Sequence, residues 1–358
     1  MDKINLYDLG LNEEYKIEAA KYGTELSIGR VSVQFGDLYQ VITEEGEMLA
    51  EVSGKLAYSA KGTRWYPSVG DWVLVDRKNN NNGNLIIHHI LSRKSSFERK
   101  TSGVRTDAQV VAANIDTIFV CMSLNNNFNV RRLERYISVA WDSNAVPVII
   151  LTKADLCSDI TDKLMEVEAA APGVDIVVTS CISEEGCINL YKYIKKGKTA
   201  AFIGSSGVGK SSLINMLKGR NILKTSSLSS DDKGKHTTTK RQLILLENGG
   251  VVIDTPGMRE LGILNADLDK SFSDIEELAM KCKFSDCQHE NEPNCAVKKA
   301  VESGMLDIGR LENYKKLQRE LKYNGLNSRE LEREKINQMF GGFGAMKEAK
   351  KFVKNKKR

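Results

Sequence analysis

The residues with the clearest chemical signature form a glycine-rich loop between an apolar run at 201–203 and a helix-forming stretch at 213–217. The loop reads Gly-Ser-Ser-Gly-Val-Gly-Lys-Ser, which is the phosphate-binding pattern G-x-x-x-x-G-K-S in its strand–loop–helix setting. Its glycines let backbone N–H groups turn toward phosphate oxygens, and the following helix adds the positive end of its dipole. In such loops the lysine reaches the β- and γ-phosphates, and the next serine ligates Mg²⁺. The sequence therefore predicts nucleotide binding by Gly204, Ser205, Ser206, Gly207, Val208, Gly209, Lys210, Ser211 and Ser212.

A second phosphate-facing element is predicted where the apolar run 251–253 leads into Asp254-Thr255-Pro256-Gly257. A carboxylate at a strand end suits the water shell of Mg²⁺, and the backbone N–H of a glycine at this place can sense a γ-phosphate. Asp254 and Gly257 are therefore expected to belong to the nucleotide site.

The polar segment between these two elements contains Gly-Lys-His-Thr-Thr-Thr at 234–239. A threonine here, for which Thr238 is our candidate, can close on Mg²⁺ when a triphosphate is bound. Ras-like GTPases orient the attacking water with a glutamine just after the D-x-x-G motif, whereas this chain has Met258, which forms no strong hydrogen bond. We expect His236 to take that role, because a neutral imidazole can accept a proton from water. The alternative is a serine- and threonine-rich loop with a solvent-exposed histidine.

A base-recognition box is predicted before the phosphate loop, at Thr152-Lys153-Ala154-Asp155. The Asp155 carboxylate can accept two hydrogen bonds from guanine, and adenine offers no matching pair of donors. Thr152 stands where such boxes carry asparagine, which leaves the contact of that side chain open. Thr179 and Ser180 follow another strand end, where a backbone N–H can meet guanine O6. The sequence favours a guanine-binding box over the alternative, an ordinary turn at the end of a strand.

Three cysteines and one histidine lie close together near the C-terminal end: Cys282, Cys287, His289 and Cys295. Four soft or borderline ligands fit a closed tetrahedral Zn²⁺ site with a structural role. A redox or incidental group is the alternative. The other four cysteines are scattered and are expected to be ordinary core or surface thiols.

Two patterns of strands position these residues. Short β-like runs at 29–33, 38–42, 48–52, 72–75 and 85–90 predict a small five-stranded barrel, of which the OB-fold is the commonest kind. An SH3-like barrel or an accessory sheet is the alternative. Polar, basic residues 95–106 are expected to be a linker.

Beyond the expected linker, fully apolar runs alternate with amphipathic ones. Strands are expected at 117–122, 146–151, 175–178 and 199–203, with helices at 130–141, 158–171 and 184–195. This alternation predicts a doubly wound parallel sheet with helices on both faces. The chain then becomes cysteine-bearing, helical and charged. We expect three domains, at 1–94, 95–269 and 270–358.

The order of the motifs is unusual, because in Ras-like GTPases the base box follows the phosphate loop. The order here resembles that of the circularly permuted GTPases. With a barrel in front and a Cys/His cluster behind, nearly the whole chain resembles the ribosome small subunit-dependent GTPase A (RsgA) family. That resemblance implies an OB-fold domain, a permuted P-loop GTPase, a zinc-binding helical domain, and subunit-stimulated GTP hydrolysis in late maturation of the small (30S) ribosomal subunit. Alternatives are an RNA-binding module that uses GTP without hydrolysis, and an unrelated P-loop ATPase or kinase.

Composition agrees with these expectations. The 41% hydrophobic and 28% charged residues are ordinary for a globular protein, and the net charge of +5 permits a nucleic-acid partner such as rRNA. The longest apolar run, 145–151, is far shorter than the ~20 residues that span a bilayer. We therefore expect a cytoplasmic protein that does not contact a membrane. Separately, we expect it to bind GTP and GDP and to be monomeric. Candidate RNA contacts are Tyr58, Lys61, Arg64, Trp65, Tyr66 and the lysine-rich tail 347–358.

Overall fold

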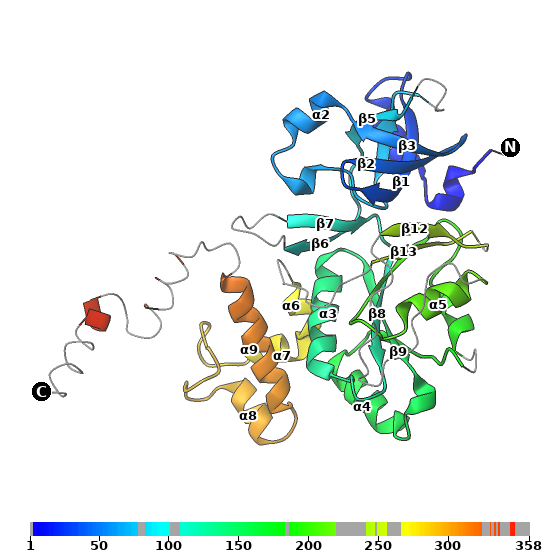
Figure 1. Ribbon diagram of the computed structural model, residues 1–358. Helices are drawn as coiled ribbons and strands as arrows, with labels where there is room; N and C mark the ends of the chain where they lie inside the picture. Colours follow the sequence, from blue (N-terminus) through cyan, green and yellow to red (C-terminus); the bar gives the residue numbers. More distant parts are fainter. Residues whose placement is uncertain are drawn as a thin grey trace, which may run out of the picture.

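The computed structural model describes residues 3–77, 83–100, 108–182, 186–219, 241–247, 249–255 and 266–323, with isolated positions 330, 333, 336 and 344–347 beyond them. Three regions follow one another along the chain: a β-barrel, an α/β region and a group of C-terminal helices (Figure 1). The predicted multidomain α/β architecture is confirmed.

The N-terminal region is a closed five-stranded barrel. Its strands pair in the order β1-β2-β3-β5-β4, and β4 returns to β1. Alternate residues such as Val31, Val41 and Leu85 point inward and are fully buried, as a closed barrel requires. The OB-like prediction is confirmed. The barrel elements are η1 (Leu6–Leu9), α1 (Glu13–Ala20), β1 (Ser27–Phe35), β2 (Leu38–Thr43), β3 (Gly46–Val52), α2 (Gly54–Ser59), η2 (Thr63–Trp65), β4 (Trp72–Val75) and β5 (Leu85–Ile90).

The expected linker at 95–106 is wrong, because most of its described part is a strand. β6 (Ser96–Lys100) pairs with β7 (Ala108–Ala113) in an antiparallel two-stranded sheet between the barrel and the α/β region (Figure 1). The segment is polar because one face meets solvent, but Phe97 on its other face is buried. One inward-facing aromatic residue was too weak a sequence signal to predict a strand, because the surrounding residues are polar and basic.

The central region is a doubly wound sheet with strand order β10-β9-β8-β11-β13-β12. All neighbours are parallel except β12 and β13. α3 and α4 pack on one face, while α5 and η4 pack on the other. The elements are β8 (Thr117–Ser123), α3 (Val130–Asp142), β9 (Val146–Thr152), η3 (Ala154–Leu156), α4 (Ile160–Ala170), β10 (Asp175–Val178), η4 (Cys187–Lys192), β11 (Thr199–Ile203), α5 (Lys210–Leu217), β12 (Gln242–Leu245) and β13 (Val251–Asp254).

The α-helix expected at 184–195 is instead the short 3₁₀ helix η4. Gly186 precedes it with φ of 79°, a left-handed conformation that cannot extend a helix backward. Cys187 and Leu190 both face the core, and their spacing of three matches the 3₁₀ period.

One buried arginine joins the barrel to the central region. Arg30 is 1% exposed and donates hydrogen bonds to the carbonyl oxygens of Leu9, Gly70 and Asn114, which belong to three separate segments. Burial lowers its pKa to about 10. The Asn114 side chain adds bonds to the Tyr15 hydroxyl and the Gly70 carbonyl. The two regions therefore meet through a bonded polar junction.

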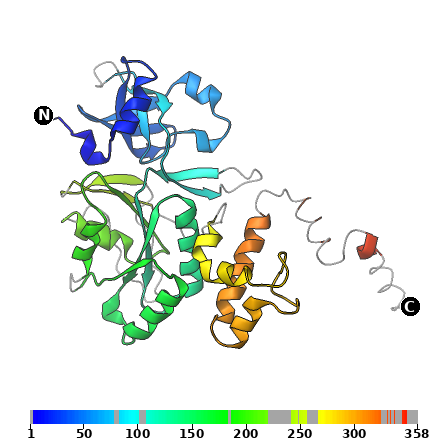
Figure 2. The same cartoon turned by 180° about the vertical axis from the view of Figure 1, so that it is seen from behind.

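The C-terminal helices lie alongside α3 in both views (Figures 1 and 2). Arg310 of α9 is 3% exposed and bonds Glu134 of α3, at 2.9 Å, and Asp274 of α7, at 2.7 and 2.9 Å. A buried charge is stable only when paired, so this cluster fixes the helices on the central α/β region. The C-terminal elements are α6 (Leu268–Ser271), α7 (Ser273–Ala279), α8 (Ala296–Glu302) and α9 (Ile308–Tyr323).

Candidate functional site

The glycine-rich loop connects β11 to α5, in the strand–loop–helix setting that the sequence predicts. Gly204 has φ of 144°, and a Cβ there would lie 2.5 Å from the carbonyl oxygen of Cys121. Gly209 has φ of 99° and caps the N-terminus of α5. Ser211 and Ser212 occupy the first turn of this helix. The loop therefore presents the start of α5, with its positive dipole end, to any bound anion.

The side chain of Lys210 is buried within the loop to which it belongs. Its ammonium group donates to the carbonyl oxygens of Gly204 and Ser205, both at 2.8 Å. Burial lowers the pKa of Lys210, and the nearby Cys121 and Asp254 oppose this effect. The cation thus rests on neutral acceptors, from which it can turn to phosphate oxygens.

Asp254 ends β13, directly beside β11, where it pairs in register with Phe202. Its side chain is 2% exposed, and burial raises its pKa to about 6, although Lys210 acts in the opposite direction. Its Oδ2 atom is buried and has no hydrogen-bond partner within the described part of the chain. An orphaned carboxylate oxygen next to a phosphate loop fits the water shell of a Mg²⁺ ion.

The base box follows β9 and meets the loop after β10. The Ser180 hydroxyl donates to the Asp155 carboxylate at 2.7 Å, and the Ala154 N–H donates to the Thr179 carbonyl at 3.2 Å. Lys153 has φ of 58°, which turns the chain between Thr152 and the exposed Asp155. The structure thus brings together the two segments that the sequence assigned to the base.

The hydroxyl of Thr152 points to the phosphate loop. It donates to the carbonyl oxygen of Val208 at 2.5 Å, across 56 residues of chain. The contact that the sequence left open for this side chain is therefore made with the loop, and it ties the base box to the phosphate loop.

Three predicted site residues, His236, Thr238 and Gly257, lie outside the described residues. Sequence reasoning also missed one contact with the loop. The Asn127 amide, in the turn after β8, donates to the Ser205 hydroxyl at 3.2 Å. The sequence feature that could have indicated this contact is the run of three asparagines, 125–127, at the carboxyl end of a buried strand.

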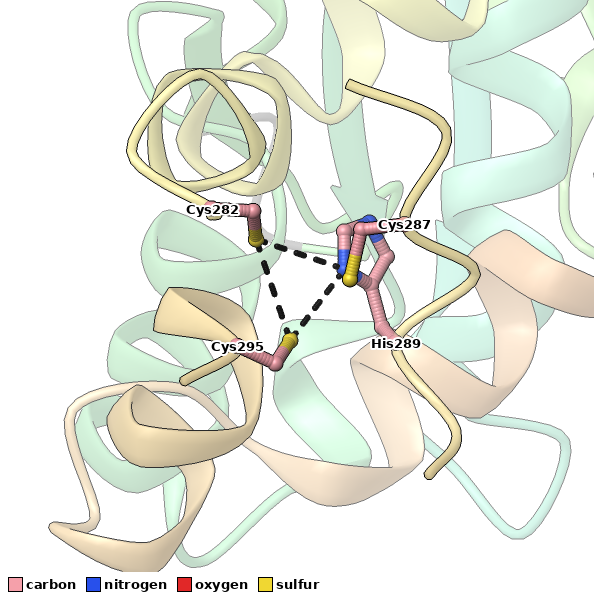
Figure 3. Close-up of side chains that lie close together, drawn as sticks. All are labelled: Cys282, Cys287, His289 and Cys295. Carbon is pink, nitrogen blue, oxygen red and sulfur yellow. Dashed lines mark hydrogen bonds between the residues drawn. The ribbon is translucent and has the colours of Figure 1, made fainter. Parts of the chain in front are cut away.

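The predicted cysteine and histidine ligands converge in the C-terminal region (Figure 3). The ligand atoms of Cys282, Cys287, His289 and Cys295 all lie within 4.8 Å of one another. His289 adopts a φ of 58°, which turns the chain so that its ring faces the thiols. These four residues could hold a metal ion. Within the described part of the chain, every helix is too short or too polar to span a bilayer.

Comparisons with known protein families and proteins agree with the site described above. Residues 90–264 match the RsgA GTPase family. Over 348 residues, the chain is 51% identical to the small ribosomal subunit biogenesis GTPase RsgA 2 of Lactiplantibacillus plantarum, covering 97% of this chain and 98% of the relative. The chain belongs to the RsgA GTPase family. An RsgA relative from Listeria innocua is 47% identical over 87% of both chains.

Solved structures agree with this family membership. YjeQ from Thermotoga maritima superimposes with a TM-score of 0.62 at 30% identity, covering 83% of this chain and 98% of that one. YloQ, described as a circularly permuted GTPase, gives a TM-score of 0.58 at 27% identity over 83% and 95%. The predicted permutation is confirmed, and membership in the RsgA family makes the chain a GTP-hydrolysing enzyme.

Proposed function

We propose that this RsgA-family GTPase binds the small (30S) ribosomal subunit, assists its late maturation, and hydrolyses GTP faster when bound to the subunit. The observation that carries the proposal is the end-to-end identity of 51% with a relative named for small ribosomal subunit biogenesis. Phosphate release from GTP, measured with free protein, naked rRNA and intact subunits, tests it. The non-hydrolysing RNA-binding alternative is not favoured, because the relatives are named GTPases.

We assign the phosphates of GTP to the loop 204–212 and guanine to Asp155, with Thr179 and Ser180 beside it. The convergence of Asp155 and Ser180 supports the base assignment. Ser211 and Thr238 would hold Mg²⁺, with Asp254 bonded to its water shell, and the ion would neutralise charge on the phosphates. Lys210 stabilises the negative charge that develops on the β- and γ-phosphates.

His236 is our proposed water-positioning residue. No glutamine follows Gly257, so another group must orient the attacking water. Binding to the subunit would bring the His236 imidazole to the γ-phosphate. A His236→Ala chain should then keep GTP affinity and subunit binding but lose stimulated hydrolysis. Stimulation as strong as that of the parent would assign this role to another group, such as one from the ribosome.

The metal of the Cys/His cluster is proposed to be one structural Zn²⁺. The Cys282 and Cys295 sulfur atoms are 3.8 Å apart, and the His289 Nδ1 lies 3.7 Å from the first and 3.4 Å from the second. Zn–S bonds of about 2.3 Å in a tetrahedron place sulfur atoms about 3.8 Å apart. Four protein ligands fill the coordination shell and leave no position for a substrate, which supports a structural role.

A surface of the barrel supports an RNA partner. Tyr58 of α2 is 94% exposed and Trp65 of η2 is 57% exposed, and neither helix buries a residue. Exposed Lys61 lies between them in the sequence. The segment is pinned by bonds from Arg93 to the Arg64 and Tyr66 carbonyls. Exposed aromatic rings and a lysine on one short segment suit base stacking and phosphate contact. The lysine-rich tail would add sequence-independent affinity.

We also place the domain boundaries at 94/95 and 269/270, and we propose that the protein is a monomer. We also propose a cytoplasmic location, because the proposed partner is the ribosomal subunit.

A further inference from the structure

We infer that Asn127 is a positioning residue for the phosphate loop. It lies between β8 and α3, outside the GTPase motifs that the sequence identified. Its Nδ2 donates a hydrogen bond to Oγ of Ser205, the second residue of the loop, at 3.2 Å. The inference rests on the assignment of residues 204–211 as the phosphate loop.

The orientation of the Asn127 amide is fixed by its other partners. Arg132 Nη2 lies 2.6 Å from the Asn127 carbonyl oxygen and 3.0 Å from its Oδ1. A guanidinium can only donate, so Oδ1 must face Arg132 and the NH₂ group must face Ser205. The Asn127 backbone N–H in turn donates to Oδ1 of Asn125 at 3.1 Å, and that atom also accepts from the Ser123 hydroxyl at 2.8 Å. Two bonds therefore hold the Asn127 side chain, and two more hold the backbone of the same residue.

Ser205 connects this arrangement to the cation of the site. Its side chain accepts from Asn127, while its backbone carbonyl accepts from the Lys210 ammonium at 2.8 Å. The residue is only 8% exposed, so it has little freedom to reorient without breaking one of these bonds. Asn127 thus fixes the part of the loop that holds Lys210. A loop that is already ordered loses less entropy when it closes around phosphates.

The kinetic consequence separates positioning from fold stabilisation. GTP and GDP share the phosphates that lie deepest in such a loop, so a contact that orders the loop contributes to both complexes and to the transition state alike. Uniform binding of this kind changes KM and leaves kcat. Asn127→Ala should raise KM for GTP and Kd for GDP by a common factor of about two to ten. A residue that only stabilised the fold would lower the active fraction, and hence the apparent kcat, at unchanged KM.

A double-variant cycle on the full chain tests the inference. KM and kcat for GTP and Kd for GDP are measured for the parent, Asn127→Ala, Ser205→Ala and the double variant. We expect the second substitution to add little to the first, because both remove the same bond. Asn126→Ala, an exposed neighbour in the same turn, serves as the matched control and should leave all three constants unchanged.

Lys210→Ala in the same assay tests the phosphate-loop assignment itself. If Lys210→Ala turns over GTP like the parent, the loop assignment has failed and the inference falls with it. If Lys210→Ala is crippled while Asn127→Ala raises neither KM nor Kd, Asn127 does not position the loop. Factors that multiply in the double variant would also overturn the inference, since they would mean that the two side chains act separately.

Discussion

The hydroxyl of Thr152 lies 2.5 Å from the carbonyl oxygen of Val208 and donates a hydrogen bond to it. Thr152 opens the base box, and Val208 lies in the middle of the phosphate loop. Both residues are almost fully buried, so water cannot replace the bond if it is lost. The two segments to which we assign guanine and the phosphates are thus joined directly, in a chain where the base box precedes the phosphate loop.

Removing this bond should weaken nucleotide binding. In Thr152→Ala the Val208 carbonyl loses its buried donor, and we expect Kd for both GTP and GDP to rise about two- to tenfold. Thr152→Ser keeps the hydroxyl and serves as the control, with affinities near those of the parent. Fluorescence titration with a labelled guanine nucleotide measures both. Equal affinity in the alanine and parent chains would show that the bond does not support the site.

Stability should depend on pH through Asp254. Burial raises its pKa from 3.8 to about 6, so the folded protein binds this proton more tightly than the unfolded chain does. The resulting contribution to stability is fully present below about pH 4 and is lost as the pH rises through about 6. Asp254→Asn removes the buried charge. Without nucleotide or Mg²⁺, the free energy of unfolding of this variant at pH 8 should be about 1–3 kcal/mol higher than that of the parent.

Urea unfolding in the presence of a chelator measures this difference at pH 8 and at pH 4.5. The gap between the Asp254→Asn variant and the parent should shrink at the lower pH, where the parent carboxyl is protonated. Asp37→Asn, at an exposed turn of the barrel, is the control and should show no such gap. A difference that is the same at both pH values would contradict the raised pKa.

Loss of the metal should unfold the C-terminal region. Metal binding contributes of order 10 kcal/mol to folding in small zinc modules, and Cys282, Cys287, His289 and Cys295 bridge α7 to α8. Cys287→Ser should lose the zinc and show faster amide hydrogen exchange in α8 and α9. Cys157→Ser, which changes a thiol outside the cluster, should keep both the metal and the protection. Elemental analysis that finds no zinc in the purified parent chain would refute this part of the account.

The buried cluster around Arg310 should be needed for docking of the C-terminal helices. Arg310→Met leaves Glu134, which is 1% exposed, and Asp274 without their shared cation. Breaking a buried pair from one side costs about 3–5 kcal/mol. Adding Glu134→Gln should recover part of the loss, because the buried carboxylate, left with Arg131 as its remaining cation at 2.8 Å, is then replaced by a neutral amide. Lys316→Met, on the exposed side of the same helix, is the control. Chemical unfolding that shows no loss in Arg310→Met would contradict this role.

The sequence predicted what is encoded locally. The glycine-rich loop, the segments after β9 and at the end of β13 that carry Asp155 and Asp254, and the Cys/His cluster are each recognisable from residues close together in the chain. The bond from Thr152 to Val208 joins residues 56 positions apart, and the bond from Arg310 to Glu134 joins residues 176 positions apart. No local sequence pattern predicts either bond. The β6–β7 sheet was missed for a related reason, since its single buried aromatic, Phe97, is outweighed by basic neighbours.

The most direct test of the proposed function is the initial rate of phosphate release from GTP by the purified full-length chain. The rate is compared for the protein alone, with naked rRNA, and with intact small ribosomal subunits. We predict slow release by the protein alone and a several-fold increase that requires the intact subunit, because we propose that docking brings His236 to the γ-phosphate. The same rate with and without subunits would contradict a subunit-stimulated GTPase, even if the protein bound GTP and RNA tightly.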